Sequence, residues 1–460
     1  MKDNILRKSM FATLISLALP SIIEQLLATL MQYIDTAMVG NYGTSATSAV
    51  GLSTTINWLI NSPISAAGLA LLVMISTSLG ENQTEKAHKT LEQANFLVLT
   101  LGVTEGVIAL VCAPFMPIWM GAEEEIRFMG SAYFAIISLP MVFRCAMLIH
   151  SMVIRATGDS KTPMIINIMA NILNVILNAF FIYPSFEIKL FSKTLYFTGF
   201  GLGAIGAGIA TALSTFVAGS LLYVIVTTRF IKRITFMPNK HILKECSVLA
   251  LPLGLTRVVS CFGYVTFAGI VSGMGTSVFA AHSIATTAET LFYIPGYGMQ
   301  NAASTLSGYS KGKQDFTLYK KVTTITIVSI AIIMTLSGTL LFVFAENLMK
   351  FFSDSEEVIR LGSSALRIVS VSEPIFGIMV IMQGLLNGLG MTRNQFVIES
   401  VCMWAVRILP TYILINHFDL GLNTVWLCMV ADNACKFIAT MIIMIRIHSP
   451  SKAFRVKSLS

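Results

Sequence analysis

The amino-acid sequence predicts an all-α polytopic membrane protein, with twelve transmembrane helices in two six-helix lobes related by a pseudo-twofold axis. Composition is the first observation behind this prediction. Of the 460 residues, 55% are hydrophobic and only 12% are charged, which is too apolar a balance for a soluble domain of this size. A series of long apolar segments is the second observation, and an internal repeat is the third.

The apolar segments are each long enough for one helical span of about 20 residues. They cover residues 10–39, 47–79, 94–117, 130–154, 164–184, 200–228, 246–271, 278–308, 322–345, 361–388, 395–416 and 421–446. Twelve spans return the chain to the side on which it began, so both termini are expected on one side of the membrane.

Lysine and arginine are distributed unevenly between the two sides. The side with both termini carries 21 of them in its polar segments, and the other side carries only five, which are Arg127, Lys189, Lys193, Lys350 and Arg360. Because cytoplasmic loops are enriched in positive charge, we expect cytoplasmic termini and a location in the inner (cytoplasmic) membrane. Topology then explains the net charge of +8, and we expect no nucleic-acid partner.

The chain repeats itself when its residue numbers are shifted by 232. This shift aligns Leu17–Pro20 with Leu249–Pro252, Pro63 with Pro295, Gly80 with Gly312, and Gly158 with Gly390. We therefore expect an N-lobe at residues 1–228, a cytoplasmic linker at residues 229–245, and a C-lobe at residues 246–460. Two half-bundles leave a cleft in which transporter substrates usually bind, so the repeat favours a transporter.

Asp35 lies near the end of the first apolar segment. A carboxylate in hydrocarbon costs about 2.5 to 3.5 kcal/mol on insertion scales, so we expect Asp35 to face protein or water and to mark a functional site. Glu24 shares its helical face about three turns away. We interpret Glu24 either as a second proton stop or as a side chain that extends to the membrane interface.

Four asparagines form a stripe in the fifth segment. Asn167, Asn171, Asn174 and Asn178 recur at steps of four, three and four residues, which places them on one helical face. Interhelical hydrogen bonding alone would explain them. With Asp35 in the same half, we favour a cation site or proton relay. The sixth segment adds the hydroxyl of Thr211 after a glycine-rich start.

The second half carries many charges inside its apolar segments, and so many opposite charges must pair or face water. They are Arg257, Glu289, Arg367, Glu373, Glu399, Arg407, Asp432 and Lys436. Asp432 and Lys436 are four residues apart and are expected to pair. A structural ion-pair network explains most of this set. The candidates for a substrate or proton pathway are Glu24, Gln32, Asn171, Glu289, Glu373 and Arg257.

Enzyme motifs are weak in this sequence. Gly201–Gly206 matches a dinucleotide-binding loop and Gly308–Gly312 matches a hydrolase elbow, but neither follows a strand in a βα unit. The sequence contains no Gly-x-x-x-x-Gly-Lys-Ser/Thr loop for ATP. We expect neither enzymatic activity nor a cofactor other than a coupling ion.

Taken together, these residues resemble the bacterial type of the multidrug and toxic compound extrusion (MATE) family. The resemblance is carried by Ile34–Gly40, Gly275–His282, Asn174–Asn178 and the stretch that ends at Thr211. It implies two six-helix lobes and efflux of drugs or metabolites driven by inward H⁺ or Na⁺. It also implies that an N-lobe cation site, able to take H⁺ or Na⁺, is formed by Asp35, Asn174, Asn178 and Thr211.

The sequence departs from the family pattern at three places. Some relatives have Asp where this chain has Asn178, and some Na⁺-coupled relatives have an acid where it has Ser260. The Leu-Glu-Arg of close bacterial relatives reads Leu255-Thr256-Arg257 here. The missing acid leads us to favour H⁺, although the oxygen ligands also suit Na⁺.

Three functions follow from these observations. We expect a monomeric, lipid-embedded secondary antiporter that exports amphiphilic cationic drugs or metabolites by alternating access. The alternative is a flippase for lipid-linked saccharides, which Arg257, Arg367 and Arg407 keep open. The third possible function is that of a membrane enzyme or channel. We find no nucleophile, metal cluster or filter-like repeat in the sequence that supports it.

Overall fold

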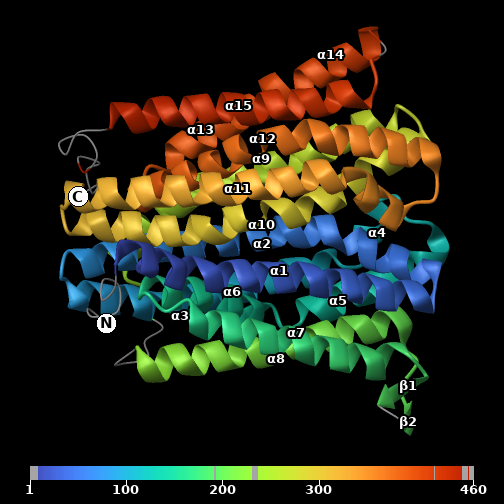
Figure 1. Ribbon diagram of the computed structural model, residues 1–460. Helices are drawn as coiled ribbons and strands as arrows, with labels where there is room; N and C mark the ends of the chain where they lie inside the picture. Colours follow the sequence, from blue (N-terminus) through green and yellow to red (C-terminus); the bar gives the residue numbers. More distant parts are fainter. Residues whose placement is uncertain (1–8, 191–192, 231–236, 419, 448–453, 455–460) are drawn as a thin grey trace. The chain divides into compact units, whose positions relative to one another are not determined.

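The computed structural model describes residues 9–190, 193–230, 237–418, 420–447 and 454. This part of the chain is almost entirely helical (Figure 1). In chain order its elements are α1 (Met10–Tyr42), α2 (Thr44–Gly80), α3 (Thr84–Cys112), α4 (Met116–Trp119), α5 (Glu124–Ser138), α6 (Met141–Ala156), α7 (Lys161–Ile182), β1 (Ser185–Leu190), β2 (Lys193–Thr198), α8 (Gly203–Arg229), α9 (Lys240–Ser272), α10 (Thr276–Gly312), α11 (Phe316–Phe352), α12 (Glu356–Gly388), α13 (Thr392–Cys402), the π-helix η1 (Met403–Ile408), α14 (Leu409–Phe418) and α15 (Leu422–Arg446).

Every predicted apolar segment coincides with a helix or a broken pair of helices. Among the described residues, ten helical stretches are long and apolar enough to cross a membrane, and α5 with α6 makes an eleventh span that is bent by 52°. The predicted segment 278–308 is the helix α10, which is 37 residues long. The chain is therefore a multi-pass membrane protein, and the twelve-helix prediction is confirmed.

The polar side chains of α10 explain why its hydropathy is lower than that of the other spans. They donate a ladder of hydrogen bonds to backbone carbonyls of α12: Gln300 to Val380 at 3.2 Å, Ser304 to Gly384 at 2.9 Å, Ser307 to Leu385 at 2.7 Å, and Lys311 to Leu389 at 2.7 Å. Each donor is thereby satisfied inside the protein and away from lipid. The discounted elbow motif Gly308–Gly312 forms the last turns of this helix, and the element directly before the helix is α9 and not a strand.

Two spans are broken, and the chain shows why. Pro140 stands between α5 and α6, where a proline cannot donate the helical hydrogen bond and its ring clashes with the preceding turn. In the span that follows α12, the π-helix η1 lies between α13 and α14. Single turns of π-helix inside α-helices occur mostly at functional sites, and η1 carries the buried Arg407.

One element lies outside the helical prediction. β1 and β2 form an antiparallel hairpin that pairs Ser185 with Thr198 and Leu190 with Lys193. Figure 1 shows this hairpin beyond the ends of α7 and α8, which it connects. The fold therefore adds a small sheet to the loop between the fifth and sixth spans.

Contacts divide the chain into two compact units. The first comprises Met1–Ile22, Leu72–Thr84 and Ser247–Ser460, and the second comprises Ile23–Leu71 and Glu85–Cys246. The helices α1 and α2 therefore each contribute residues to both units. Of the expected linker, residues 231–236 lie outside the described residues. The same holds for eight of the 21 charges counted for topology, Lys2, Arg7, Lys8, Lys232, Arg233, Lys452, Arg455 and Lys457.

In the first unit, Gly80 and Gly312, which the repeat aligns, lie against each other. A Cβ added to Gly80 at the end of α2 would lie 3.0 Å from the Cα of Gly312 at the end of α10, and it would overlap the carbonyl of Tyr309. Small residues at helix crossings let backbones approach this closely.

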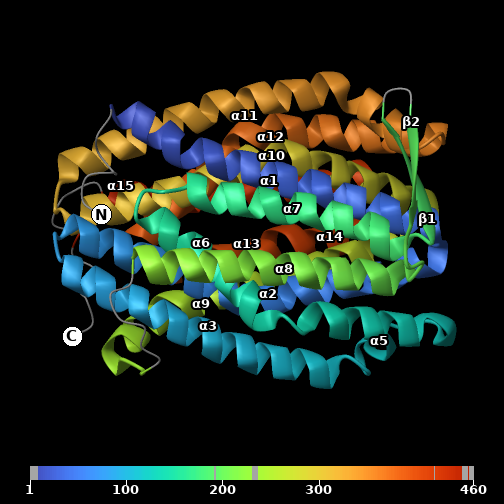
Figure 2. The same ribbon diagram turned by 90° about the horizontal axis from the view of Figure 1, so that it is seen from below.

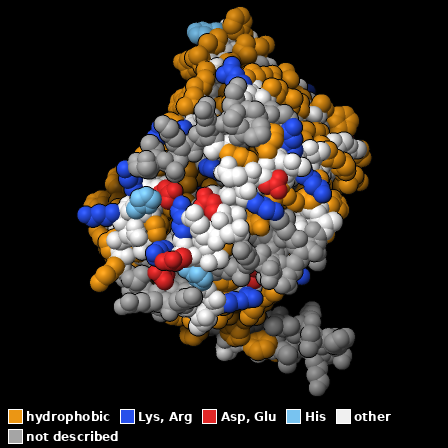
Figure 3. Space-filling view, turned by 90° about the vertical axis from the view of Figure 1, so that its left-hand side faces the viewer, with side chains coloured by type: hydrophobic (Ala, Val, Ile, Leu, Met, Phe, Trp, Pro, Cys, Tyr) orange, Lys and Arg blue, Asp and Glu red, His pale blue; other side chains and the backbone are white. Residues whose placement is uncertain are grey.

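Figure 3 looks onto one end of the helices and shows charged side chains there, with hydrophobic side chains along the sides.

Candidate cation site

In the second unit, Asp35 lies on α1. Figure 2 shows α1 running beside α7. Asn178 donates from Nδ2 to Asp35 Oδ1 at 2.7 Å. The Asn174 amide is assigned with its nitrogen toward Asp35, 2.9 and 3.0 Å from the two carboxylate oxygens, because this orientation satisfies both ends of the amide. The Asn174 oxygen then accepts from Thr211 Oγ1 at 3.2 Å. The structure thus brings all four residues together, from α1, α7 and α8.

Two tyrosines hold the end of α1 in place near this site. The Tyr183 hydroxyl donates to the carbonyl of Met38 at 2.8 Å, and the Tyr42 hydroxyl donates to the carbonyl of Gly201 at 2.9 Å. Gly203 has a φ of +55°, and a Cβ there would overlap the Tyr42 ring. The glycine-rich stretch therefore lets the start of α8 approach α1, which carries Asp35 close to Thr211.

The partners of Asp35 are all neutral. In the described part of the chain, no Lys, Arg or His forms an ion pair with Asp35, which is half-buried. The Asn178 oxygen is buried and receives no hydrogen bond, and such an unsatisfied acceptor is costly in a protein interior. A bound cation would neutralise the carboxylate, and the Asn178 amide, whose nitrogen faces Asp35 here, would turn to bring this oxygen to the cation. Carboxylate, amide and hydroxyl oxygens are the ligands that Na⁺ and other hard cations prefer, and the carboxylate alone can hold a proton.

Glu24 lies on the same pair of helices and has a charged partner. Its carboxylate accepts from Arg155 Nη2 of α6 at 2.6 Å and from Asn167 Nδ2 of α7 at 2.7 Å. The Glu24 and Arg155 side chains are 14% and 8% exposed. The Glu24 carboxylate is therefore held by two protein partners inside the unit. Arg155, counted with the loop charges, is also buried.

The remaining first-half candidates lie on these helices without reaching the carboxylate. Gln32 is exposed on α1, and Asn171 is half-buried on α7 between Asn167 and Asn174. The structure gives neither side chain a contact with Asp35 among the described residues. The asparagine stripe therefore supplies two residues to Asp35 and one to Glu24.

The first unit contains a buried charge cluster in place of such a site. Asp432 lies 2.7 Å from Arg407 and 3.0 Å from Lys436, and Lys436 also contacts Glu399 at 2.7 Å. The predicted Asp432–Lys436 pair is confirmed. Two cations and two carboxylates balance one another, so this cluster needs no ion from solution. Its side chains come from α13, η1 and α15.

The other second-half candidates form no ion pair with this cluster among the described residues. Glu373 on α12 is 1% exposed, and one of its carboxylate oxygens has no hydrogen-bond partner among the described residues. Glu289 is half-buried on α10, and Arg257 is exposed on α9. Arg367 pairs at 3.8 Å with Glu346, where both side chains are exposed.

Sequence reasoning missed two charged residues in the second unit. Arg144 of α6 donates to the amide oxygen of Asn57 at 3.2 Å. Both carboxylate oxygens of Glu105 on α3 are buried without a partner among the described residues. The signal was present, since each is a lone charge in an apolar segment. Charges inside apolar segments were collected for the second half of the sequence only. The same search in the first half finds both Glu105 and Arg144.

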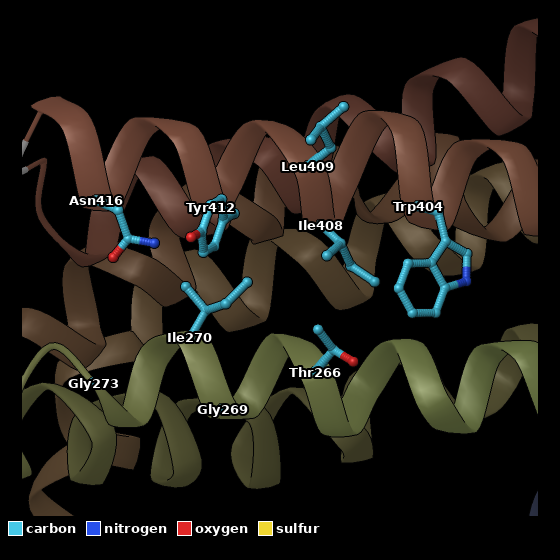
Figure 4. Close-up of a pocket in the computed structure, with 9 residues that line it drawn as sticks. All are labelled: Thr266, Gly269, Ile270, Gly273, Trp404, Ile408, Leu409, Tyr412 and Asn416. Carbon is cyan, nitrogen blue, oxygen red and sulfur yellow. The ribbon is translucent and has the colours of Figure 1, made fainter.

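The first unit also contains a groove between α9 and the span that η1 interrupts (Figure 4). It has a volume of about 550 Å³ and is lined by Thr266, Gly269, Ile270, Gly273, Trp404, Ile408, Leu409, Tyr412 and Asn416. Side chains of the two elements face each other across it. Trp404, Leu409 and Tyr412 are exposed, as expected of a groove that lipid tails fill.

Comparisons with known proteins agree with this geometry. The family model MatE matches residues 20–180 and 252–413, so the predicted repeat aligns the start of one match with the start of the other. The chain is 28% identical to the probable multidrug resistance protein NorM of Thermotoga maritima, over 91% of this chain and 89% of that protein. It is 27% identical to the multidrug resistance protein MdtK of Proteus mirabilis, over 87% of each chain. The crystal structure of a MATE protein in complex with MaD3S superposes with a TM-score of 0.89 at 20% identity, over 98% of this chain and 99% of that one.

Proposed function

Since the chain belongs to the MatE family, the multidrug and toxic compound extrusion transporters, we propose that it exports amphiphilic cationic compounds in exchange for H⁺ or Na⁺. The observation that carries this proposal is the Asp35 carboxylate, which neutral side chains hold beside the buried, unsatisfied oxygen of Asn178. Relatives that bear multidrug resistance names support the class of substrate. Drug export, and not catalysis, is the activity proposed.

The coupling step is the loading of Asp35. A cation from outside neutralises the carboxylate. The amides of Asn174 and Asn178, which donate to the charged carboxylate, would turn to offer a bound Na⁺ their oxygens beside that of Thr211. Release to the cytoplasm restores a negative site, which then suits a cationic drug. Alternating access links the two steps, because the site then opens to one side of the membrane at a time.

H⁺ is the proposed coupling ion. Ser260 stands where some Na⁺-coupled relatives have an acid, and the four oxygen-bearing side chains at Asp35 fit either ion. Transport in proteoliposomes, with ΔpH and ΔNa⁺ imposed separately, tests this assignment. Uphill export of ethidium is expected under ΔpH, and export under ΔNa⁺ alone would overturn the choice of H⁺. Export under neither gradient would overturn the proposed function.

We propose cytoplasmic termini, a monomer and a location in the inner membrane. The asymmetry of 21 to five positive charges supports the orientation. A cysteine introduced at Ser460 is expected to resist an impermeant thiol reagent applied to intact cells and to react after permeabilisation. Labelling in intact cells would contradict this orientation.

A flippase for lipid-linked saccharides is the second candidate. Arg144 has a neutral hydrogen-bond partner, Asn57, and Arg257 is exposed. Among the described residues, neither arginine forms an ion pair with a carboxylate, and this is the support for the second candidate. Two uncompensated guanidinium groups favour a cargo with phosphate. Drug-stimulated cation flux with no movement of a fluorescent lipid-linked phosphosugar would exclude this candidate.

A further inference from the structure

The helices α1 and α7 make the same contact twice. Asn178 donates to Asp35, and Asn167 donates to Glu24, both from Nδ2 at 2.7 Å. The two carboxylates are separated along α1 by the same number of positions as the two asparagines along α7. This separation is about three helical turns, or about 16 Å. One carboxylate–amide station therefore follows the other along a single helix pair.

The two stations differ in charge. Asp35 has only neutral partners, whereas the Arg155 guanidinium lies 2.6 Å from Glu24 with both side chains largely buried. The first station can take a cation, and the second already contains one that is covalently part of the protein. A buried carboxylate that is paired in this way has no free charge to offer a second ion.

We propose that Arg155 is a built-in cation that blocks the path of the coupling ion between Asp35 and the N-terminal part of α1. The guanidinium fills the Glu24 station and repels any ion that leaves Asp35 along the α1–α7 face. Asp35 is then the single loading station, and the ion passes only when the Glu24–Arg155 contact opens. This inference rests on the proposed cation coupling at Asp35.

The position of Glu24 in α1 suits a contact that opens. The helix passes from one compact unit to the other between Ile22 and Ile23, directly before Glu24. Pro20 removes one backbone hydrogen bond from the same turn. Arg155 Nε and Asn167 Oδ1 are buried without partners among the described residues, so the cluster retains a donor and an acceptor that are unused in this arrangement.

The test measures cation leak without drug in proteoliposomes that contain the full chain, with a proton-sensitive or Na⁺-sensitive dye. Arg155→Gln is expected to raise drug-independent leak of the coupling ion by about tenfold or more and to lower the drug exported per ion. Arg155→Lys keeps the charge and should leak less than one-third as much as Arg155→Gln. Adding Asp35→Asn to the double variant Glu24→Gln with Arg155→Gln should abolish the leak, because the ion then has no carboxylate at either station.

Two variants guard against a purely structural effect. Arg229→Gln removes an arginine that pairs with Asp159 at 3.2 Å on the surface of the same unit, and it should not leak. The double variant Glu24→Gln with Arg155→Gln leaves no unpaired charge, so it should fold where the single variant does not, and it should still leak.

Unaltered leak and coupling in both Arg155→Gln and the double variant would overturn the inference. A leak that persists when Asp35→Asn is added to the double variant would also overturn it. Failure of the unaltered protein to couple drug export to either ion would instead refute the proposed function, and the leak measurements would still decide whether Arg155 is a barrier.

Discussion

The two halves of the repeat share a scaffold but differ at the position of the coupling carboxylate. The repeat aligns Asp35 with Phe267, which is buried. The Phe267 ring lies 5.7 Å from the Arg407 guanidinium and 5.7 Å from the His282 ring. Where the first half has a carboxylate among neutral amides, the second half has an aromatic ring beside arginine, and that arginine pairs with Asp432.

This difference teaches which features of a repeat follow from folding and which follow from function. The glycine and proline landmarks recur because both halves must bend and pack their helices in the same way. The charges within and next to the apolar segments that carry the site do not recur, since the repeat aligns Glu24 with Thr256 and Arg155 with Asn387. The buried cluster of the second half neutralises its own charges, while the Asp35 carboxylate of the first half has only neutral partners. The halves are therefore expected to respond differently to loss of a carboxylate.

The largest expected effect is that of Asp35→Asn, which should preserve expression and folding but abolish uphill efflux. A neutral amide can neither take up a proton at this pH nor balance a cation, and the site contains no second carboxylate among the described residues. Ethidium export under ΔpH and under ΔNa⁺ is the measurement. Export against a gradient by this variant would mean that the carboxylate is structural.

Asp432→Asn should act on stability and not on coupling. It leaves Arg407 and Lys436 with one carboxylate between them in a buried cluster, and breaking a buried pair in this way costs about 3 to 5 kcal/mol. Unfolding in detergent should show this loss, while the folded fraction keeps its dependence on the coupling ion. Arg229→Gln at the exposed Asp159 pair is the control and should cost about 1 kcal/mol or less. Unchanged stability of Asp432→Asn would contradict the view of a self-neutralised cluster.

Asn178→Leu should change the coupling-ion requirement by about tenfold, because a hydrogen bond to a charged group contributes about 1.5 to 3 kcal/mol. If the coupling ion is Na⁺, loss of the Asn178 amide removes a ligand and should raise the Na⁺ concentration for half-maximal export. It should lower the H⁺ concentration required if the ion is H⁺, since the charged carboxylate loses support. Asn171→Leu removes an amide of the same stripe without a contact to Asp35 and sets the baseline. Equal behaviour of the two variants would remove Asn178 from the site.

The smallest expected effect is that of Pro63→Ala and Pro295→Ala, which should each slow turnover by a few fold. Both prolines lie inside continuous helices, α2 and α10, at repeat-related positions. Since the scaffold is what the halves share, the two variants should behave alike in steady-state export. If both transport at the normal rate, these prolines serve packing alone.

Periodicity was sufficient to predict the helices and the asparagine stripe, whereas the grouping of Asp35 with Asn174, Asn178 and Thr211 was implied by the resemblance to the MATE family. Apolar length fixes the spans, and steps of three and four place Asn174 and Asn178 on one face of α7. Periodicity does not determine which side chains of other helices meet a given face. Arg155 was therefore assigned to a loop although it pairs with Glu24, and the contact of Arg407 with Asp432 required the structure. The hairpin β1–β2 was missed because the segment is short and lies between two spans.

The hydrogen-bond ladder between α10 and α12 has a consequence for synthesis. The carbonyls that accept from Gln300, Ser304, Ser307 and Lys311 belong to Val380, Gly384, Leu385 and Leu389, which leave the ribosome well after their donors. Until then these polar groups have no acceptor on α12, and insertion of so polar a helix into lipid is costly. Stable integration of α10 therefore waits for α12, and a chain truncated before Val380 is expected to leave α10 poorly inserted.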